Sequence, residues 1–485
     1  MRFPRSSGLL LHPTSLAGGH GIGDLGPAAH EFLDFLTAAG QSLWQVLPIG
    51  PTGYGDSPYQ TFSAFAGNPL LISLGEPGPG PEGDVDFEEV LAHKWPLLRK
   101  AALRFRGRKL SAPWLKDYTL FMALKEAHGM RAWPEWPAEL RDREPAALER
   151  ARRELREDIE VHEALQSLFF EQWNSLRDAC HRRGVRLMGD IPIYAAGDSS
   201  DVWVHRDYWQ VRPDGNPEWM AGVPPDYFSA TGQLWGNPIY RWDRHARDSY
   251  SWWVERFRAT FELFDMVRID HFRGFQAYWQ VPWGETTAMH GEWIPGPGAG
   301  LFEAVEEELG ELPVLAENLG VITPEVEAIR KRFGFPGMAI LQFAFGNDPQ
   351  APDFKPHNYP REIVAYSGTH DNDTTVGWWT SAGAGDSTRT AAEVAAERAF
   401  TLEYLGVDGS EIQWSFLRAL MASVADTVIF PVQDVLGLGS EARMNTPATL
   451  GRNWKWRMKP GALTPAHAER LRKMASAYDR LPGTR

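Results

Sequence analysis

The sequence is poor in cysteine and in long apolar runs. Its 485 residues include one cysteine, Cys180, so neither an intrachain disulfide nor a zinc knuckle can form. This favours a reducing compartment. No stretch approaches the roughly 18 uncharged apolar residues of a membrane span, and the first apolar run breaks at His12-Pro13, too early for a signal peptide. We therefore expect a cytoplasmic protein that does not span a membrane.

Clustered positive charge is also missing. The net charge is −14, and Lys and Arg do not gather in a block, which argues against a nucleic-acid partner. Tryptophan, in contrast, is abundant, with 21 residues, many of them in polar or Gly/Pro-rich stretches such as DVWVHRDYWQ and QLWGNP. Aromatic faces in loops can stack on sugars, although a large aromatic core is the commoner reason for such a count.

Short apolar runs alternate with helical patterns along most of the chain. Runs that are apolar on both faces and are separated by helices indicate a parallel sheet, and eight such units indicate an α/β fold of the (β/α)8 TIM barrel type. A helix is predicted over 27–40, and Thr323-Pro324-Glu325 predicts the start of another. The predicted strands occupy 7–13, 42–50, 185–194, 264–272, 313–320, 338–345, 362–371 and 425–434.

A bare barrel needs only about 250 residues, so large insertions must interrupt it. We expect a single catalytic barrel over 1–485 with two insertions. Residues 54–165 form a helix-rich subdomain, in which alternating Arg and Glu indicate a solvated helix face. Residues 195–242 are expected to form a second insertion, which is Trp-rich and loop-like.

A dinucleotide-binding fingerprint is present but incomplete. Gly21, Gly23 and Gly26 have the G-x-G-x-x-G spacing between a strand and a helix. The fingerprint also requires an acid at the end of the next strand, and that strand ends VLPIGPTG. We therefore interpret the glycines as a tight turn and expect no cofactor.

Charged and polar residues gather at the predicted carboxyl ends of the strands, where a barrel carries its chemistry. A lone acid at such a place usually caps a helix or lies on the surface, and we interpret Asp434 in this way. Several acids and histidines around one barrel mouth instead indicate an active site. The other candidates are Asp190, Arg268, Asp270, His271, Glu317, Asn318, His370, Asp371, Asn372 and Asp373.

Two kinds of chemistry fit these residues. A metal site would use His370, Asp371, Asp270 and His271 as ligands. However, adjacent residues on a strand point to opposite faces, so His370 and Asp371 would not bind one metal together unless the strand had already ended. Arg268 shares a face with Asp270, where it would compete with a cation. The same arginine would lower the pKa of Asp270 and keep it ionised. The spacing favours glycosyl transfer by paired carboxylates, without a metal.

The roles follow from the chemistry of a glycosidic bond. Asp270 would attack the anomeric carbon, and Glu317, with a pKa raised by neighbouring carboxylates, would protonate the leaving oxygen. Asp371 would bind sugar hydroxyls and stabilise the positive charge, while His370 and Arg268 would donate hydrogen bonds. If the reaction retains the configuration of the anomeric carbon, the two carboxyl groups should lie about 5–5.5 Å apart.

Several sequence blocks resemble one family. VRIDHFRG, LAENLG and YSGTHDNDT are similar to blocks of the 4-α-glucanotransferases, also called amylomaltases or disproportionating enzymes, which are relatives of the α-amylases. The resemblance extends over essentially the whole chain and includes GPTGYGDSPYQTFSAFAGNP, GVPPDYFSATGQLWGNPIY and RMNTPAT. It implies transfer of α-1,4-glucan segments from maltooligosaccharides, amylose or glycogen to glucose or another glucan. We expect a monomer.

The resemblance also implies site residues. Asp270 matches the family's nucleophile, Glu317 its acid/base and Asp371 its transition-state-stabilising aspartate. Gln233 and Trp235 match a loop that covers the acceptor side of the groove. The residues that match sugar-cleaving-subsite positions are Tyr59, Asp190, Arg268 and His370; Tyr54 matches a second glucan site and Asn445 a glucan contact.

The residues alone do not show which molecule accepts the glycosyl group from Asp270. An attacking water would make the chain an α-glucan hydrolase, and an attacking sugar 4-OH would make it a transferase. A non-catalytic glucan-binding protein and a metal-dependent barrel enzyme are the alternatives from other classes, and the complete acid trio argues against the first of these two.

Overall fold

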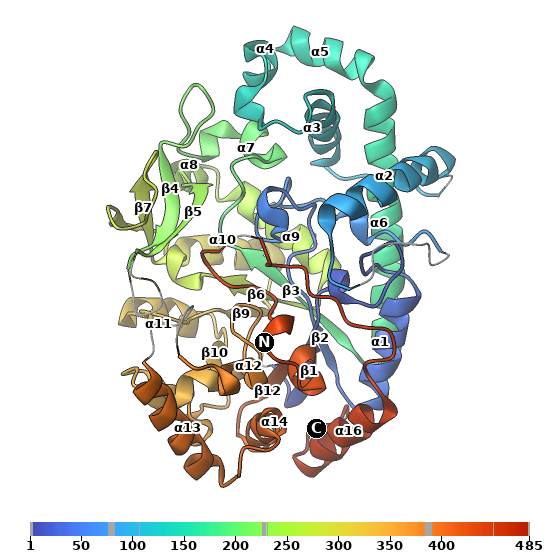
Figure 1. Cartoon of the computed structure of the whole chain (residues 1–485). Coiled ribbons are helices and arrows are strands. Elements are labelled where there is room, and N and C mark those ends of the chain that lie inside the picture. Colours follow the sequence, from blue (N-terminus) through green and yellow to red (C-terminus); the bar gives the residue numbers. More distant parts are fainter. Residues whose placement is uncertain are drawn as a thin grey trace.

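Figure 1 shows a central barrel of parallel strands, surrounded by helices and flanked by a smaller sheet. The computed structural model describes residues 3–75, 83–105, 107–225, 229, 231–383, 390–449 and 451–483. The barrel strands lie in the order β10-β11-β12-β1-β2-β3-β6-β9, and the N–H of Ala316 donates to the carbonyl of Pro336 (3.0 Å), which joins β9 to β10. The strands are β1 (Ser6–Leu10), β2 (Leu43–Gln45), β3 (Arg186–Pro192), β6 (Met266–Asp270), β9 (Val314–Ala316), β10 (Gly337–Ile340), β11 (Ile363–Tyr366) and β12 (Thr427–Pro431).

Every predicted apolar run overlaps one of these eight parallel strands, which confirms the predicted barrel. The strands are shorter than the runs. β11, for example, ends at Tyr366, although its run was predicted to continue to Asp371. Several of the polar residues expected at strand ends therefore lie in the loops that follow, where the backbone no longer alternates between two faces.

Most of the barrel strands are followed by helices. The helix predicted over 27–40 is present as α1, and its apolar residues face the barrel. α11 begins at Pro324 as predicted, but the Thr323 side chain makes no capping hydrogen bond. Among the described residues, no helix is both long and apolar enough to cross a bilayer. The α-helices are α1 (Pro27–Ala38), α2 (Phe87–Arg104), α3 (Leu115–Ala127), α4 (Ala138–Arg141), α5 (Pro145–Glu154), α6 (Arg156–Arg182), α7 (Ser200–Val204), α8 (Trp242–Arg247), α9 (Ser251–Leu263), α10 (Ala299–Leu309), α11 (Pro324–Arg332), α12 (Thr375–Thr380), α13 (Ala391–Leu405), α14 (Ile412–Ala422), α15 (Val432–Leu436) and α16 (Pro465–Ala477).

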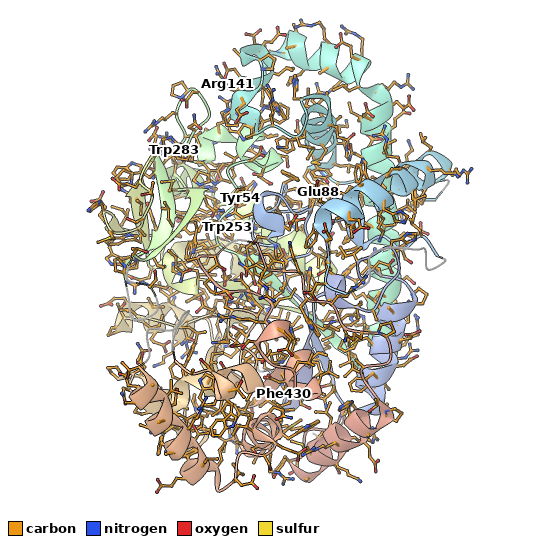
Figure 2. All side chains as sticks on the ribbon, viewed as in Figure 1. Tyr54, Glu88, Arg141, Trp253, Trp283 and Phe430 are labelled. Carbon is orange, nitrogen blue, oxygen red and sulfur yellow. The ribbon has the colours of Figure 1, made fainter. Side chains whose placement is uncertain are left out.

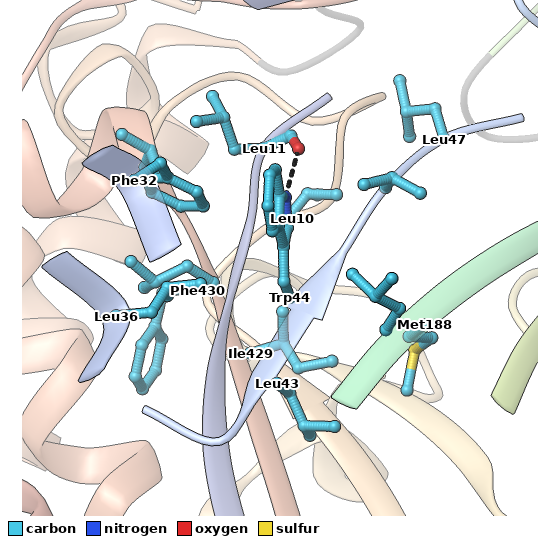
Figure 3. Close-up of a cluster of buried hydrophobic side chains, with 14 of the residues drawn as sticks. Leu10, Leu11, Phe32, Leu36, Leu43, Trp44, Leu47, Met188, Ile429 and Phe430 are labelled. Atoms are coloured by element: carbon cyan, nitrogen blue, oxygen red, sulfur yellow. Dashed lines mark hydrogen bonds between the residues drawn. The ribbon is translucent and has the colours of Figure 1, made fainter. Parts of the chain in front are cut away.

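Trp44 on β2 anchors the packing between the barrel and α1 (Figure 3). Its indole is fully buried and meets the Phe32 ring edge-on at 4.9 Å. Its Nε1–H donates to the carbonyl of Leu11 at 2.8 Å. Burial of so large a ring contributes strongly to stability, and the hydrogen bond satisfies the polar atom that burial would otherwise leave unpaired.

The segment between β2 and β3 is rich in helix. It contains α2, α3, α4 and α5, and α6 leads from it back to the barrel; Figure 1 shows this group at the upper right. The alternating Arg and Glu residues of α5 are largely solvated, as in the exposed pair of Arg150 with Glu139 at 2.8 Å. The alternating charges of α5 therefore indicate a helix face that is exposed to solvent.

The loop-like structure expected for 195–242 is wrong. This segment contains α7 and two antiparallel strands, β4 (Trp219–Val223) and β5 (Gln233–Pro238). They join β7 (Ala277–Pro282) and β8 (Glu292–Pro295) in a four-stranded sheet of order β5-β4-β7-β8. The partner strands lie far away in the sequence, so the Gly/Pro-rich segment carries no local signal of the pairing.

Many of the tryptophans belong to an aromatic core. Trp203 and Trp209 come from a polar stretch in which a sugar-stacking role was considered, yet both are fully buried. Trp209 packs edge-on against Trp252 at 5.3 Å, and Trp253 packs on Trp252 at 5.5 Å. These tryptophans are therefore part of a large aromatic core, which is the commoner reason for a high tryptophan count.

The glycines of the dinucleotide-like motif serve close packing. A Cβ atom at Gly23 would lie 2.0 Å from the carbonyl oxygen of Pro13, in the turn after β1. At Gly26, which precedes α1, a Cβ would lie 2.2 Å from the Ser73 hydroxyl. The geometry supports the interpretation of a tight turn.

Asp434 in α15 organises the start of α12. It is 1% exposed, so it is not a surface residue. Its Oδ1 accepts the N–H of Thr375 at 2.7 Å, and its Oδ2 accepts the hydroxyls of Thr375 and Ser367 at 2.8 and 2.6 Å. Because Thr375 is the first residue of α12, the carboxylate caps a neighbouring helix.

Replacement of Asp434 by alanine should lower the free energy of unfolding by about 3 kcal/mol, since it strands buried donors that now bond a carboxylate. Urea unfolding followed by far-UV circular dichroism measures the change. The control is Asp243→Ala, which removes only an exposed pair with Arg247 and should cost less than about 0.5 kcal/mol. Equal losses in the two variants would contradict a structural role for Asp434.

Candidate active site

The predicted acids lie at one end of the barrel. Asp190 and Asp270 belong to the carboxyl-terminal parts of β3 and β6, and Glu317 follows β9 directly. His370 and Asp371 lie in the loop between β11 and α12. Because all eight strands are parallel, these residues meet at a single mouth.

Arg268 links two of the acids. Its side chain is only 4% exposed, its Nη1 donates to Asp190 Oδ2 at 2.6 Å, and its Nη2 donates to Asp270 Oδ1 at 2.6 Å. The Tyr59 hydroxyl donates to the same Asp190 oxygen at 3.0 Å. The i, i+2 spacing on β6 thus places Arg268 and Asp270 on one face, as predicted.

Asp190 has a raised pKa although it is paired with Arg268. Burial and the nearby Asp270 carboxylate raise the pKa of Asp190 to about 6, while Arg268 and His370 act in the opposite direction. Its hydrogen bonds with Arg268 and Tyr59 fix one oxygen of this carboxyl group.

Glu317 is partly buried and is oriented by backbone groups. Its Oε1 accepts the N–H of Leu319 at 2.7 Å, and its Oε2 accepts the N–H of His271 at 2.8 Å. Burial, with Asp270 in support, raises the pKa of Glu317 to about 7, although Arg268 and the two amides lower it. A carboxyl group that titrates near neutral pH can both give and take a proton there.

Asp371 has the opposite character. Burial raises its pKa, but His370, Asn445 and Arg268 more than offset this effect and hold it below its usual range. His370 Nε2 lies 3.3 Å from Oδ2, and Asn445 Nδ2 donates to Oδ1 at 2.6 Å. Asp371 is therefore a permanently ionised acceptor.

The strand that precedes His370 and Asp371 ends early. These two residues are expected to point to opposite faces unless the strand has already ended, and β11 does end at Tyr366, so both side chains turn toward the same site. Within the part of the chain that the structure describes, no group of three or more His, Cys, Asp or Glu side chains is arranged to hold a metal ion.

Trp235 and Gln233 on β5 reach the same site from the four-stranded sheet. The Trp235 indole meets the His271 ring edge-on at 4.9 Å, and its Nε1–H donates to Gln233 Oε1 at 3.2 Å. Gln60, next to Tyr59, donates to the carbonyl of Trp235 (3.3 Å) and to Asn237 Oδ1 (2.9 Å). The Tyr59 loop and β5 are thereby fastened together beside the acids.

Tyr54 stands apart from the other predicted residues. It lies in the short 3-10 helix η2 (Tyr54–Asp56), and its side chain is 75% exposed; Figure 2 labels it. Among the described residues, no hydrogen bond or ring contact joins its side chain to Asp270, Glu317 or Asp371. The structure places it on the surface, outside the acid cluster.

Sequence reasoning missed part of the site. The rings of Trp454 and His370 lie 5.9 Å apart, and Tyr59 stacks on His370 at 5.2 Å. His12 follows β1, and burial and the adjacent His370 lower its pKa to about 3. Arg443 Nη2 donates to the backbone carbonyl of Asp371 at 2.7 Å. The strand-end rule could have identified His12, whereas Trp454 and Arg443 come from a late loop without a local signal.

Comparison with known proteins gives one consistent result. The profile of a family described as 4-alpha-glucanotransferase matches residues 11–464. A 4-alpha-glucanotransferase of Thermus thermophilus is 51% identical over 99% of this chain and 100% of its own length, and that of Synechocystis is 45% identical over 98% of both. The structure of an amylomaltase from Streptococcus agalactiae in complex with acarbose is similar with a TM-score of 0.91, at 37% identity, over 98% of this chain and 99% of that one.

Proposed function

We propose a residue-by-residue mechanism for this chain, which belongs to the 4-alpha-glucanotransferase family. Membership rests on the family profile and on close relatives matched over nearly their whole length, and it establishes the activity as 4-alpha-glucanotransferase, acting on α-1,4-glucans. The roles of individual residues are our inference from the geometry of the site. The proposed mechanism rests on one observation: the pKa of Glu317 is raised to about 7, and Glu317 lies beside Asp270, which is bound to Arg268.

In the first half-reaction the Asp270 carboxylate attacks the anomeric carbon. The bond from this carbon to the glycosidic oxygen breaks, and Glu317 gives its proton to that oxygen. The product is a glycosyl ester of Asp270 and a shortened glucan with a free 4-OH. Arg268 supports the step because its Nη2 donates to Asp270 Oδ1 at 2.6 Å and so holds the attacking group in place.

In the second half-reaction Glu317, now a carboxylate, takes the proton of an incoming 4-OH. The acceptor oxygen then attacks the anomeric carbon and releases Asp270. Two inversions restore the α configuration, and the mechanism implies carboxyl groups about 5–5.5 Å apart. One residue serves as acid and then as base, for which a pKa of about 7 suits Glu317 well.

Asp371 stabilises the charge that develops on the sugar ring between these steps. Its ionised state is secured by His370 and Asn445, so it can accept ring hydroxyls while it faces an oxocarbenium-like centre. Tyr59, Asp190, Arg268 and His370 bind the same sugar unit. Tyr54, exposed on the surface, belongs to a second glucan site.

The side of the substrate groove that binds the acceptor sugar lies under the four-stranded sheet. Trp235 and Gln233 cover the glycosyl ester from β5 and exclude water, so that a sugar hydroxyl reacts in its place. In this view 1–485 is one catalytic barrel, 54–165 is a helix-rich insertion and 195–242 is the insertion over the groove. Glucose is an acceptor, the protein is a monomer, and it acts in the cytoplasm.

Product analysis on maltotriose tests the activity. We expect longer oligosaccharides to appear, and added glucose to change their distribution by competing as acceptor. Asp270→Asn should lower the rate by roughly three orders of magnitude or more. The matched control is Asp265→Asn, just before β6, where the carboxylate accepts the N–H of Leu187 at 2.8 Å far from the mouth. Formation of glucose and maltose alone would indicate a hydrolase, and full activity of Asp270→Asn would refute the nucleophile.

The pH dependence follows from Glu317. The group must be protonated before the first half-reaction, and its pKa is about 7. The value of kcat/KM should therefore be retained below pH 7 and should fall about tenfold per pH unit well above it. Initial rates on maltotriose between pH 5 and pH 9 measure this limb. A profile that stays flat to pH 9 would assign the proton to another group.

The indole of Trp235 should control the competition between water and sugar. Trp235→Ala is expected to raise the ratio of hydrolysis to transfer by roughly tenfold, which corresponds to about 1.4 kcal/mol of barrier difference. Released glucose and elongated products are quantified from the same maltotriose reaction. Trp283→Ala is the control, because Trp283 directly follows β7 and is 39% exposed (Figure 2). An unchanged ratio in Trp235→Ala would remove the water-excluding role.

A further inference from the structure

The residue that follows Asp270 has an unusual backbone conformation. His271 adopts the left-handed region, with φ +54° and ψ +49°, between the end of β6 and the 3-10 helix η6 (Phe272–Phe275). Residues other than glycine rarely do so, because the Cβ atom crowds the neighbouring carbonyl. Such strain persists when the surrounding structure enforces it, and it is frequent at functional sites.

The left-handed turn lets the chain leave β6 while the His271 N–H remains directed at Glu317. This N–H lies 2.8 Å from Oε2, and the Leu319 N–H lies 2.7 Å from Oε1. The carboxyl group is thus held between amides of two different loops, one on each oxygen. Each carboxylate oxygen has two acceptor positions, so the amides leave one position on each oxygen for the proton.

The His271 side chain offers no comparable interaction. Its ring is buried against Trp235, and burial lowers the pKa of the imidazole to about 4, so the ring is neutral near pH 7. Among the described residues, His271 Nε2 has no hydrogen-bond partner. What His271 contributes to Glu317 is therefore its main chain.

We propose that His271 is a positioning residue, whose left-handed turn fixes the orientation of the Glu317 carboxyl group and so the position from which its proton is delivered. The inference rests on the proposed role of Glu317 as acid and base. It differs from a purely structural role, because it predicts that the backbone conformation at position 271 matters and the imidazole does not.

The charged groups around Glu317 set the direction of the expected pH effect. Arg268 and Asp270 on β6 act on it from one side, and the amides of His271 and Leu319 hold its oxygens. Burial and Asp270 raise the pKa of Glu317, whereas Arg268 and both amides lower it. Loss of the His271 amide bond should therefore move the alkaline limb of activity to higher pH, while kcat falls because the acid is misaligned.

Four substitutions separate the backbone from the ring. His271→Gly and His271→Asn remove the imidazole but tolerate the left-handed conformation, whereas His271→Ala and His271→Val remove it and disfavour that conformation. We expect kcat of His271→Val to be about a hundredfold below that of His271→Gly. The alkaline limb should be displaced upward in the Ala and Val variants and not in the Gly and Asn variants.

Equal losses in all four variants would overturn the inference, because they would trace the effect to the ring. Circular dichroism and melting curves establish that each variant is folded. If His271→Val does not fold, His271→Ala against His271→Gly makes the same comparison.

A fluoride donor separates this inference from the proposed role of Glu317. An α-maltosyl fluoride needs no proton on its leaving group, so first-turnover fluoride release should be near the wild-type rate in Glu317→Ala and in His271→Val alike. A slow Glu317→Ala would refute Glu317 as the acid, and with it the basis of the inference. A normal Glu317→Ala with a slow His271→Val would leave the mechanism intact and overturn the positioning role of His271.

Discussion

The site depends on one buried guanidinium group. Arg268 holds Asp190 on one side and Asp270 on the other, each at 2.6 Å, in a place from which water is largely excluded. Carboxylates gathered at a barrel mouth repel one another, and a planar cation with forked donors can neutralise two of them while it fixes their positions. Loss of this guanidinium would leave both carboxylates without the cation that they now share.

Glu317 and Asp371 show how the same mouth gives two carboxyl groups opposite properties. Glu317 accepts hydrogen bonds from two backbone amides, and burial dominates, so its pKa rises to about 7. At Asp371, by contrast, His370 and Asn445 contact the carboxylate oxygens and hold the pKa below the usual range. The difference comes from the groups that touch each oxygen, and it matches the need for one group that exchanges protons and one that stays charged.

The barrel and the acid cluster were predictable because both follow local rules. Apolar runs identify buried parallel strands, and Asp190, Arg268, Asp270 and Glu317 lie at or beside their ends. The remainder depends on contacts between distant segments. The pairing of β4 with β7, the stacking of Trp454 near His370 and the left-handed turn at His271 are decided by tertiary packing. Composition was misleading for Trp203 and Trp209, which come from a polar stretch but are buried.

The four-stranded sheet has an evolutionary consequence. β4 and β5 come from the loop after β3, while β7 and β8 come from the loop after β6, and β4 pairs with β7 from Trp219 to Gly222. Two loops that are separate in the sequence are thus one unit in space, joined by main-chain hydrogen bonds. A graft of either loop into a relative would leave a strand edge unpaired. The transplantable module of this barrel is the pair of loops, so lengths and registers in the two segments have to diversify together.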